Sequence, residues 1–290
     1  MTTIGFLGFG EASFNIADGL REEGMTGIRA FDAAWQTPPA AAMIADRAEA
    51  AGVALDPSAA ALIAAVDIVV CSISANAAVP VAREVAPLLR SGQVYVDLNS
   101  AGPDTKLAVE RLIPKGVAFV DVAVMGTVPG NRHRVPMLAS GAGAAAFAAF
   151  GNAFGMAITA LDGPAGKASA SKMFRSIFMK GYVMLLLEAV VAGRKFGIEE
   201  DVLASIGQSL GVADFRATAS DLMCRAVIHA ERREHEMAEV VATLDSLGVD
   251  ATMSVAGREK LEWCVRQGFR EHFGGKPPAD FQDIFAALQT

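Results

Sequence analysis

Short apolar runs alternate with alanine-rich stretches of helical periodicity from the N-terminus to about Asp162. The apolar runs are rich in β-branched residues, and this alternation is typical of βαβ units on a parallel sheet. Residues 68–73, with the sequence IVVCSI, are apolar almost without a break, as expected of a strand that helices cover on both faces. The predicted strands are Thr3–Leu7, Gly27–Phe31, Asp67–Ser72, Gln93–Asp97, Ala118–Val122 and Pro136–Ala139, and the predicted helices between them are Ala12–Glu23, Ala40–Ala51, Val79–Leu89 and Thr105–Ile113.

After Asp162 the pattern changes to helices alone. Residues Ala165–Phe196 contain no proline and few polar residues, and they predict one long helix that is apolar nearly all round, as in a core. The sequence therefore predicts an α/β fold with a doubly wound parallel sheet in residues 1–162, followed by an all-α domain in residues 163–290, joined by this long interdomain helix. Further helices are predicted at Glu199–Ser209, Val212–Leu247 (with a break) and Val255–Gln267, and a short helix near the C-terminus.

Composition and charge argue against some classes of binding partner. The chain has 52% hydrophobic and 20% charged residues, as in folded globular proteins, and its net charge of -7 argues against a nucleic-acid partner. Its cysteines, Cys71, Cys224 and Cys264, lack the paired spacing of a disulfide framework or zinc site, which favours a reducing, cytoplasmic setting. The sequence has no signal-peptide pattern and no run of about eighteen uncharged apolar residues, so no membrane partner is expected.

A glycine-rich turn follows the first predicted strand, with the sequence Gly8-Phe9-Gly10-Glu11-Ala12-Ser13. This is a G-x-G-x-x-G pattern with serine in the third glycine position. The first glycine permits a tight turn, the second lets a pyrophosphate approach the backbone at a helix N-terminus, and the third position needs only a small residue. Because the turn lies between a strand and a helix, it favours a Rossmann-type dinucleotide-binding domain over an ordinary tight turn.

Asp32 ends the second predicted strand, at the spacing expected of a carboxylate that binds the adenosine ribose 2′-hydroxyl. Such a carboxylate would repel a 2′-phosphate, so the sequence favours NAD as cofactor. Arg29 and Trp35 lie nearby, and they leave NADP possible.

Polar residues also follow the later strands, at the edge where parallel strands present a ligand crevice. Ser72 ends one predicted strand, and Ile73 and Ser74 follow it. Asn99, Ser100 and Ala101 follow the next strand within Asp97–Pro103, and Met125, Gly126 and Thr127 follow a third. We predict cofactor contacts for Ser72, Ile73, Ser74 and Asn99. Ordinary Asx, serine and glycine turns would explain the same residues.

Lys172 lies on a face of small and apolar residues in the long predicted helix. A lysine held in a cleft has a lowered pKa, which suits proton transfer to or from a hydroxyl group near neutral pH. A surface lysine whose stem packs on alanine is the alternative.

Together these motifs resemble the β-hydroxyacid dehydrogenase superfamily, which includes 3-hydroxyisobutyrate dehydrogenase, tartronate semialdehyde reductase and 6-phosphogluconate dehydrogenase. Asp97–Pro103 matches the family element D-x-[SN]-[ST]-x-x-P, and Gly163, Gly166 and Lys172 match in order the start of its interdomain helix. The GEAS turn, the AGKASASKM stretch and HAERREHEMAEVVATL look most like the phosphogluconate-dehydrogenase-like branch with an uncharacterised C-terminal domain.

The resemblance implies an enzyme that transfers a hydride between NAD(P) and the carbinol of a small anionic hydroxy acid, with Lys172 as the general acid/base. It also implies a homodimer. Two positions depart from the family: Met125 replaces its substrate-binding serine, and Ser176 replaces its asparagine. The substrate residues that the resemblance implies are Ser100, Ala101, Met125, Gly126, Thr127 and Ser176.

Two other functions stay open at this point: oxidative decarboxylation of a phosphogluconate-like sugar acid, and NAD(P) binding or sensing without catalysis. Basic residues are a weaker signal. Arg132, His133 and Arg134 lie in a loop and are candidates for recognising an acid, or a solvated surface. For Arg225, His229, Arg232 and Arg233 the sequence favours a solvated, salt-bridged helix face over an anion site, and it predicts no metal site at Glu231 and His235.

Overall fold

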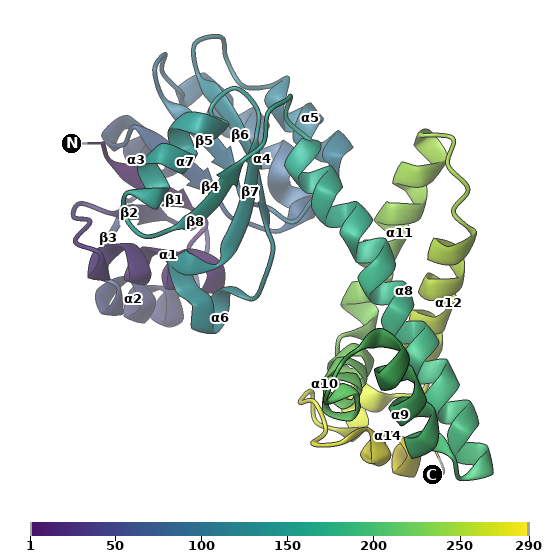
Figure 1. Ribbon diagram of the computed structural model, residues 1–290. Helices are drawn as coiled ribbons and strands as arrows, with labels where there is room; N and C mark the ends of the chain where they lie inside the picture. Colours follow the sequence, from purple (N-terminus) through teal and green to yellow (C-terminus); the bar gives the residue numbers. More distant parts are fainter. Residues whose placement is uncertain (1, 289–290) are drawn as a thin grey trace. The chain divides into compact units, whose positions relative to one another are not determined.

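One eight-stranded sheet forms the N-terminal part of the chain in the computed structural model, which describes residues 2–288 (Figure 1). The strand order is β3-β2-β1-β4-β5-β6-β7-β8. The chain therefore reverses its direction of winding after β3, between β1 and β4, which is where doubly wound folds bind ligands. The strands are β1 (Ile4–Leu7), β2 (Arg29–Phe31), β3 (Ala54–Leu55), β4 (Ile68–Cys71), β5 (Val94–Asp97), β6 (Ala118–Val124), β7 (Pro136–Ser140) and β8 (Ala157–Ala160).

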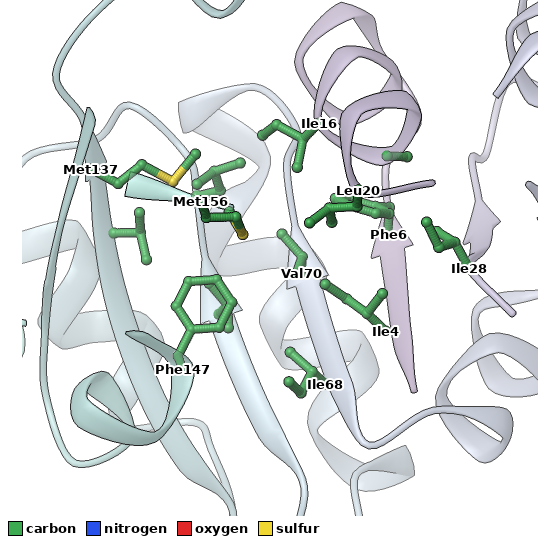
Figure 2. Close-up of a cluster of buried hydrophobic side chains, with 14 of the residues drawn as sticks. Ile4, Phe6, Ile16, Leu20, Ile28, Ile68, Val70, Met137, Phe147 and Met156 are labelled. Atoms are coloured by element: carbon green, nitrogen blue, oxygen red, sulfur yellow. The ribbon is translucent and has the colours of Figure 1, made fainter. Parts of the chain in front are cut away.

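Helices cover both faces of this sheet. Side chains from α1, α2 and α7 share one core with one face of the strands, and side chains from α3, α4 and α5 share another core with the opposite face. Figure 2 shows the first core, where Ile16 and Leu20 of α1 lie among strand side chains such as Phe6 and Val70. The helices are α1 (Glu11–Glu22), α2 (Ala40–Ala50), α3 (Ala59–Ala65), α4 (Ala78–Val85), α5 (Pro103–Glu110), α6 (Val128–Asn131) and α7 (Ala144–Asn152).

The predicted fold class is confirmed, with the last two strands, β7 and β8, in the opposite direction. β7 pairs antiparallel with β6, whereas the sequence pattern predicted parallel strands throughout. Only residues 125–135 connect the two strands, which is fewer than the dozen or so that a parallel crossover needs. The sequence pattern also missed β3 and β8, because β3 has 2 residues and β8 is mostly exposed at the sheet edge.

The described residues form two compact units that divide within α8, after Lys172. The second unit is helical, and its core contains side chains of every long helix, such as Val190, Met223 and Leu261. The predicted run Val212–Leu247 is two helices, which are separated at His229. The helices are α8 (Lys167–Phe196), α9 (Glu199–Leu210), α10 (Phe215–Ile228), α11 (Ala230–Ser246), α12 (Thr252–Arg266), α13 (Phe269–His272) and α14 (Phe281–Ala287).

Helix α8 is long and apolar enough to cross a membrane by length and composition, with a mean hydropathy of 1.6 in its most apolar window. Charged residues such as Lys180 and Glu188 lie within the helix, so it contains no uncharged apolar run of about eighteen residues. Core helices of soluble proteins pass the same test, so the feature is weak evidence for a membrane span.

Candidate functional site

The two glycines of the turn between β1 and α1 have different roles. Gly8 has a φ of 91°, and a Cβ there would lie 2.4 Å from the carbonyl oxygen of Ser72. At Gly10, in contrast, a Cβ would meet no heavy atom within 4 Å. Gly10 is the N-cap of α1 and provides no side chain to its free amides. The fold therefore requires glycine at position 8, and position 10 leaves the backbone open to a ligand.

Ser13, in the third position of the motif, has a structural role. Its hydroxyl is buried and donates a hydrogen bond to the Gly8 carbonyl oxygen at 2.7 Å. A serine can therefore replace the family's third glycine, because its side chain stabilises the turn instead of obstructing it. Glu11 is exposed and Ala12 half-buried in the first turn of α1.

The Asp32 carboxylate lies beside this turn. Its Oδ2 accepts a hydrogen bond from the Phe9 N–H at 2.8 Å, and its Oδ1 accepts one from the Ala34 N–H at 2.9 Å. Both contacts are to backbone, so the carboxylate has a fixed position with lone pairs remaining on each oxygen.

The two residues that left NADP possible have different environments. Arg29 forms an ion pair with the buried Asp56, so its guanidinium already has a counterion within the sheet domain. The indole N–H of Trp35 is buried and has no acceptor among residues 2–288. A buried donor without a partner is costly, and a ligand oxygen would satisfy it.

Asn99 connects the ends of β4 and β5. Its Oδ1 accepts a hydrogen bond from the Ile73 N–H at 2.6 Å, and its Nδ2 donates to the Cys71 Sγ at 3.6 Å. With 4% exposure, the carboxamide holds the loop after β4 in place. Of the predicted cofactor residues in that loop, Ser72 and Ile73 are half-buried and Ser74 is exposed.

A buried charge network lies behind these loops. The Nζ of Lys106, on α5, donates to the Asp97 carbonyl at 2.8 Å and to its Oδ1 at 2.9 Å, and lies 3.6 Å from the Asp121 Oδ1. Asp97 and Asp121 are register partners on β5 and β6, and all three side chains are fully buried. The sequence analysis missed this network, although two aspartates at equivalent strand ends were a signal for a buried cation between them.

Asp121 also holds the start of α8. Its Oδ2 accepts hydrogen bonds from the N–H groups of Gly166 and Ser169, both at 3.0 Å, and its Oδ1 accepts one from the Ser169 hydroxyl at 2.5 Å. The Ser140 hydroxyl, on β7, accepts from the Ala168 N–H at 3.0 Å. The free amides of the α8 N-terminus are therefore satisfied by the sheet, and the first turns of the helix are fixed against it.

This anchoring brings Lys172 to Ser100. The Lys172 Nζ donates to the Ser100 Oγ at 3.2 Å, so the predicted lysine and the predicted element after β5 lie together. Lys172 is half-buried and Ser100 is exposed. An ammonium group and a hydroxyl group therefore meet at the sheet edge where β5 ends, the edge that also carries Gly10.

The remaining predicted substrate residues differ in exposure. Met125 is half-buried and its N–H donates to the Pro136 carbonyl at 2.8 Å, whereas Gly126 and Thr127 are exposed. Ala101 is half-buried next to Ser100, and Ser176 is half-buried one turn after Lys172 in α8. Among the described residues, no group of three or more His, Cys, Asp and Glu side chains is placed to hold a metal ion.

Arg132, His133 and Arg134 lie against α1. Arg132 forms ion pairs with Asp18 and, at 2.6 Å, with Glu22, and Arg134 pairs with Glu23. His133 is buried, and this burial lowers its pKa. Because both guanidinium groups form ion pairs with carboxylates of α1, this loop has a structural role, and the structure does not favour the hypothesis that it recognises an acid.

Comparison with known proteins identifies both halves of the chain. Residues 3–159 match the family model described as the NAD binding domain of 6-phosphogluconate dehydrogenase. Residues 194–264 match a domain of unknown function, DUF1932. An uncharacterised 28.5 kDa protein of Methanothermus fervidus is 26% identical over 237 residues, covering 82% of this chain and 88% of the relative.

Solved structures agree with this match. A conserved hypothetical protein from Sinorhizobium meliloti 1021 is 37% identical, with a TM-score of 0.78 over 90% of this chain and 88% of that one. A conserved protein of unknown function, described as structurally similar to 3-hydroxyacid dehydrogenases, is 31% identical, with a TM-score of 0.77 over 90% and 96%. A Mycobacterium tuberculosis 3-hydroxyisobutyrate dehydrogenase with L-serine, 19% identical, has the same fold over 100% of both chains, with a TM-score of 0.77.

The predicted resemblance and the predicted dinucleotide cofactor are confirmed by these matches. The N-terminal domain is an NAD-binding domain with a dehydrogenase fold, and the C-terminal helices carry the domain of unknown function. The chain thus belongs to the family with the NAD-binding domain of 6-phosphogluconate dehydrogenase, among the proteins that resemble β-hydroxyacid dehydrogenases.

Proposed function

We propose that this protein is an NAD-dependent dehydrogenase that transfers a hydride between nicotinamide and the carbinol carbon of a small hydroxy acid. The observation that carries the proposal is the contact between the Lys172 Nζ and the Ser100 Oγ at 3.2 Å. This contact places Lys172, the candidate general acid/base, beside the loop after β5, at the edge of the sheet where NAD-binding domains bind their ligands.

Three features of the sheet domain fit a dinucleotide. The open space at Gly10 and the uncapped N-terminus of α1 suit a pyrophosphate. The fixed Asp32 carboxylate suits a ribose hydroxyl and disfavours a 2′-phosphate, and Arg29 is committed to Asp56. The unpaired indole N–H of Trp35, three residues after Asp32, is a donor for the same end of the cofactor. These features favour NAD over NADP.

Lys172 is the proposed general acid/base. The bound dinucleotide supplies the hydride acceptor or donor. In oxidation the neutral amine of Lys172 takes the hydroxyl proton, and in reduction its ammonium returns that proton to the carbonyl oxygen. The Ser100 hydroxyl accepts one N–H of Lys172, which restricts its long side chain to one direction. Asn99 acts indirectly, since its buried side chain fixes the neighbouring loop.

The substrate contacts proposed for the element after β6 and for α8 indicate a substrate unlike the family's better-known acids. Met125 cannot donate a hydrogen bond where the family has serine, and Ser176 offers one hydroxyl where the family has a carboxamide. Ser100, Ala101, Gly126 and Thr127 complete the proposed set. Because hydrogen bonds set specificity, we expect the chemistry to be retained and the preferred acid to differ.

The test is NADH formation or consumption across a panel of hydroxy acids and their oxo partners, with NADP(H) in parallel. Lys172→Ala should lower kcat/KM on the order of a hundredfold or more. Lys167→Ala is the matched control, because Lys167 is an exposed lysine in the first turn of the same helix. Full activity of Lys172→Ala would refute the assignment, and NADH binding without turnover of any compound would refute the dehydrogenase activity on this substrate class. Release of carbon dioxide would identify oxidative decarboxylation.

A further inference from the structure

The segment that connects β6 to β7, residues 125–135, has an unusual backbone conformation at Arg132. Its φ is 54° and its ψ is -132°, and among residues 2–288 it is the one residue other than glycine with a positive φ. A residue with a Cβ adopts this conformation only at a cost in free energy, and it persists where the surrounding contacts require it. The contacts of Arg132 therefore show what holds the β6–β7 segment in place.

The Arg132 guanidinium bridges two carboxylates of α1. Its Nη1 lies 2.6 Å from the Glu22 Oε2, and its Nη2 pairs with the Asp18 Oδ2. Asp18 and Glu22 are four residues apart and share one face of the helix, so the planar fork of the arginine spans one helical turn. The arginine side chain is only 28% exposed, so water screens these pairs less than it screens pairs on the open surface.

His133 shows how closely the same segment lies against α1. Its ring is buried, and a Cβ at Gly19 would lie 1.9 Å from the His133 Nδ1. The His133 Nε2 lies 3.4 Å from the Glu23 Oε1. The β6–β7 segment is therefore held on α1 by packing as well as by charge.

The proposed substrate element lies at the start of this segment. Met125–Thr127 follow β6 directly, and β6 runs parallel to β5, so the element lies at the edge of the sheet where Ser100 follows β5. The Asn131 Nδ2 donates to the Thr127 carbonyl at 2.9 Å, and this contact joins the residue before Arg132 to the element. Fixing Arg132 therefore also fixes the backbone of Thr127.

Helix α1 connects this contact to the proposed cofactor site. It begins after Gly10, where the open backbone suits a pyrophosphate, and its last two turns carry Asp18 and Glu22. Figure 1 shows α6, which is part of the β6–β7 segment, beside α1. All of these residues lie in the first unit of the chain. One helix thus offers its first turn to the cofactor and its last turns to Arg132.

We propose that Arg132 is a positioning residue, which holds the substrate element Met125–Thr127 in a fixed place relative to the cofactor helix α1. It acts through the two carboxylates of α1 and through the strained backbone that they maintain, without touching the substrate itself. What the element binds rests on the proposed function, whereas the anchoring of the segment does not. This role differs from the recognition of an acid, for which the sequence made Arg132 a candidate.

The test measures hydrogen–deuterium exchange of the full chain by mass spectrometry, together with NADH binding by fluorescence titration. Arg132→Gln should raise the exchange of residues 125–135 and leave the NADH affinity unchanged. Arg132→Gly should raise it as well, because glycine accepts the positive φ but forms no ion pair. Arg132→Lys should recover part of the protection, since a lysine keeps the charge but lacks the planar fork.

Arg21→Gln is the matched control. Arg21 also pairs with Asp18, at 3.1 Å, but it lies on α1 itself, so this variant removes a cation from the same carboxylate without changing the β6–β7 segment. Its exchange should match the wild type. Circular dichroism checks that each variant is folded.

The outcomes separate this inference from the dehydrogenase proposal. Wild-type exchange in Arg132→Gln or Arg132→Gly, an equal rise in Arg21→Gln, or weaker NADH binding by Arg132→Gln would overturn the positioning role. If the hydroxy-acid panel gives no turnover while exchange rises only in the Arg132 variants, the dehydrogenase proposal fails and the anchoring of the segment stands.

If turnover is found, the two KM values add a second readout. Arg132→Gln should raise the KM for the acid by about tenfold and leave the KM for NAD unchanged, because a misplaced element weakens contacts to the substrate alone. A merely structural role would lower Tm without separating the two values. An unchanged KM for the acid, or an equal rise in both, would therefore overturn the inference.

Discussion

Lys106→Met removes the cation from the buried network of the sheet domain. Lys106 is fully buried, and its Nζ lies 2.9 Å from the Asp97 Oδ1 and 3.6 Å from the Asp121 Oδ1. Methionine keeps the length of the side chain but leaves two carboxylates next to each other in the interior. Removing one partner of a buried ion pair costs about 3–5 kcal/mol, and we expect a loss of that size.

The assay is unfolding of the full chain by heat and by urea, followed by circular dichroism. At about 2–4 °C per kcal/mol for a domain of this size, the expected loss lowers Tm by roughly 6–20 °C. Lys115→Met is the control, because Lys115 is an exposed lysine shortly after α5. We expect Lys115→Met to unfold within about 0.5 kcal/mol of the wild type.

A double variant distinguishes lost charge pairing from a packing defect. Lys106→Met together with Asp97→Asn leaves one buried carboxylate, Asp121, which keeps its hydrogen bonds to Gly166 and Ser169. It should therefore recover a large part of the stability lost in the single variant. A single-variant loss below about 1 kcal/mol, or a double variant less stable than the single one, would refute the network as a charge-balanced unit.

Four further substitutions test the glycine-rich turn, the ribose carboxylate and the basic loop. Gly8→Ala should lower Tm because its Cβ would collide with the Ser72 carbonyl at positive φ, whereas Gly10→Ala should keep Tm and weaken NADH binding, measured by fluorescence titration, at least tenfold. Asp32→Gly should lower the preference for NADH over NADPH in the same titration, and an unchanged ratio would contradict the role of the carboxylate. Gly19→Ala would place a Cβ 1.9 Å from the His133 Nδ1, and it should lower Tm by displacing the loop that Arg132 ties to α1.

Local patterns were sufficient to predict most of the sheet. Strands such as β4 have continuous β-branched runs, and the turn at Gly8 requires particular backbone angles, so both are visible in the sequence alone. β8 was missed because its pairing with β7 depends on a partner and not on its own exposed residues. The direction of β7 was likewise decided by the length of one loop.

In the candidate site, too, residues that belong to a local motif were predictable, and residues whose role depends on distant neighbours were not. The motifs identified Gly10, Asp32, Ser100 and Lys172, because each follows a strand or matches a spaced pattern. The roles of buried polar groups were not predictable: whether Asn99 faces a ligand or holds a loop depends on the position of Ile73 in space.

The buried network of Lys106, Asp97 and Asp121 explains why Lys172, on α8, lies at the edge of the sheet beside Ser100. The N–H groups at the start of α8 donate to Asp121 and Ser140, so β6 and β7 hold the first turn of the helix. Lys106 balances the charge that this arrangement brings into the interior. The position of Lys172 beside Ser100 therefore depends on residues that touch neither, and a change at Asp121 should lower the proposed dehydrogenase activity even in a folded protein.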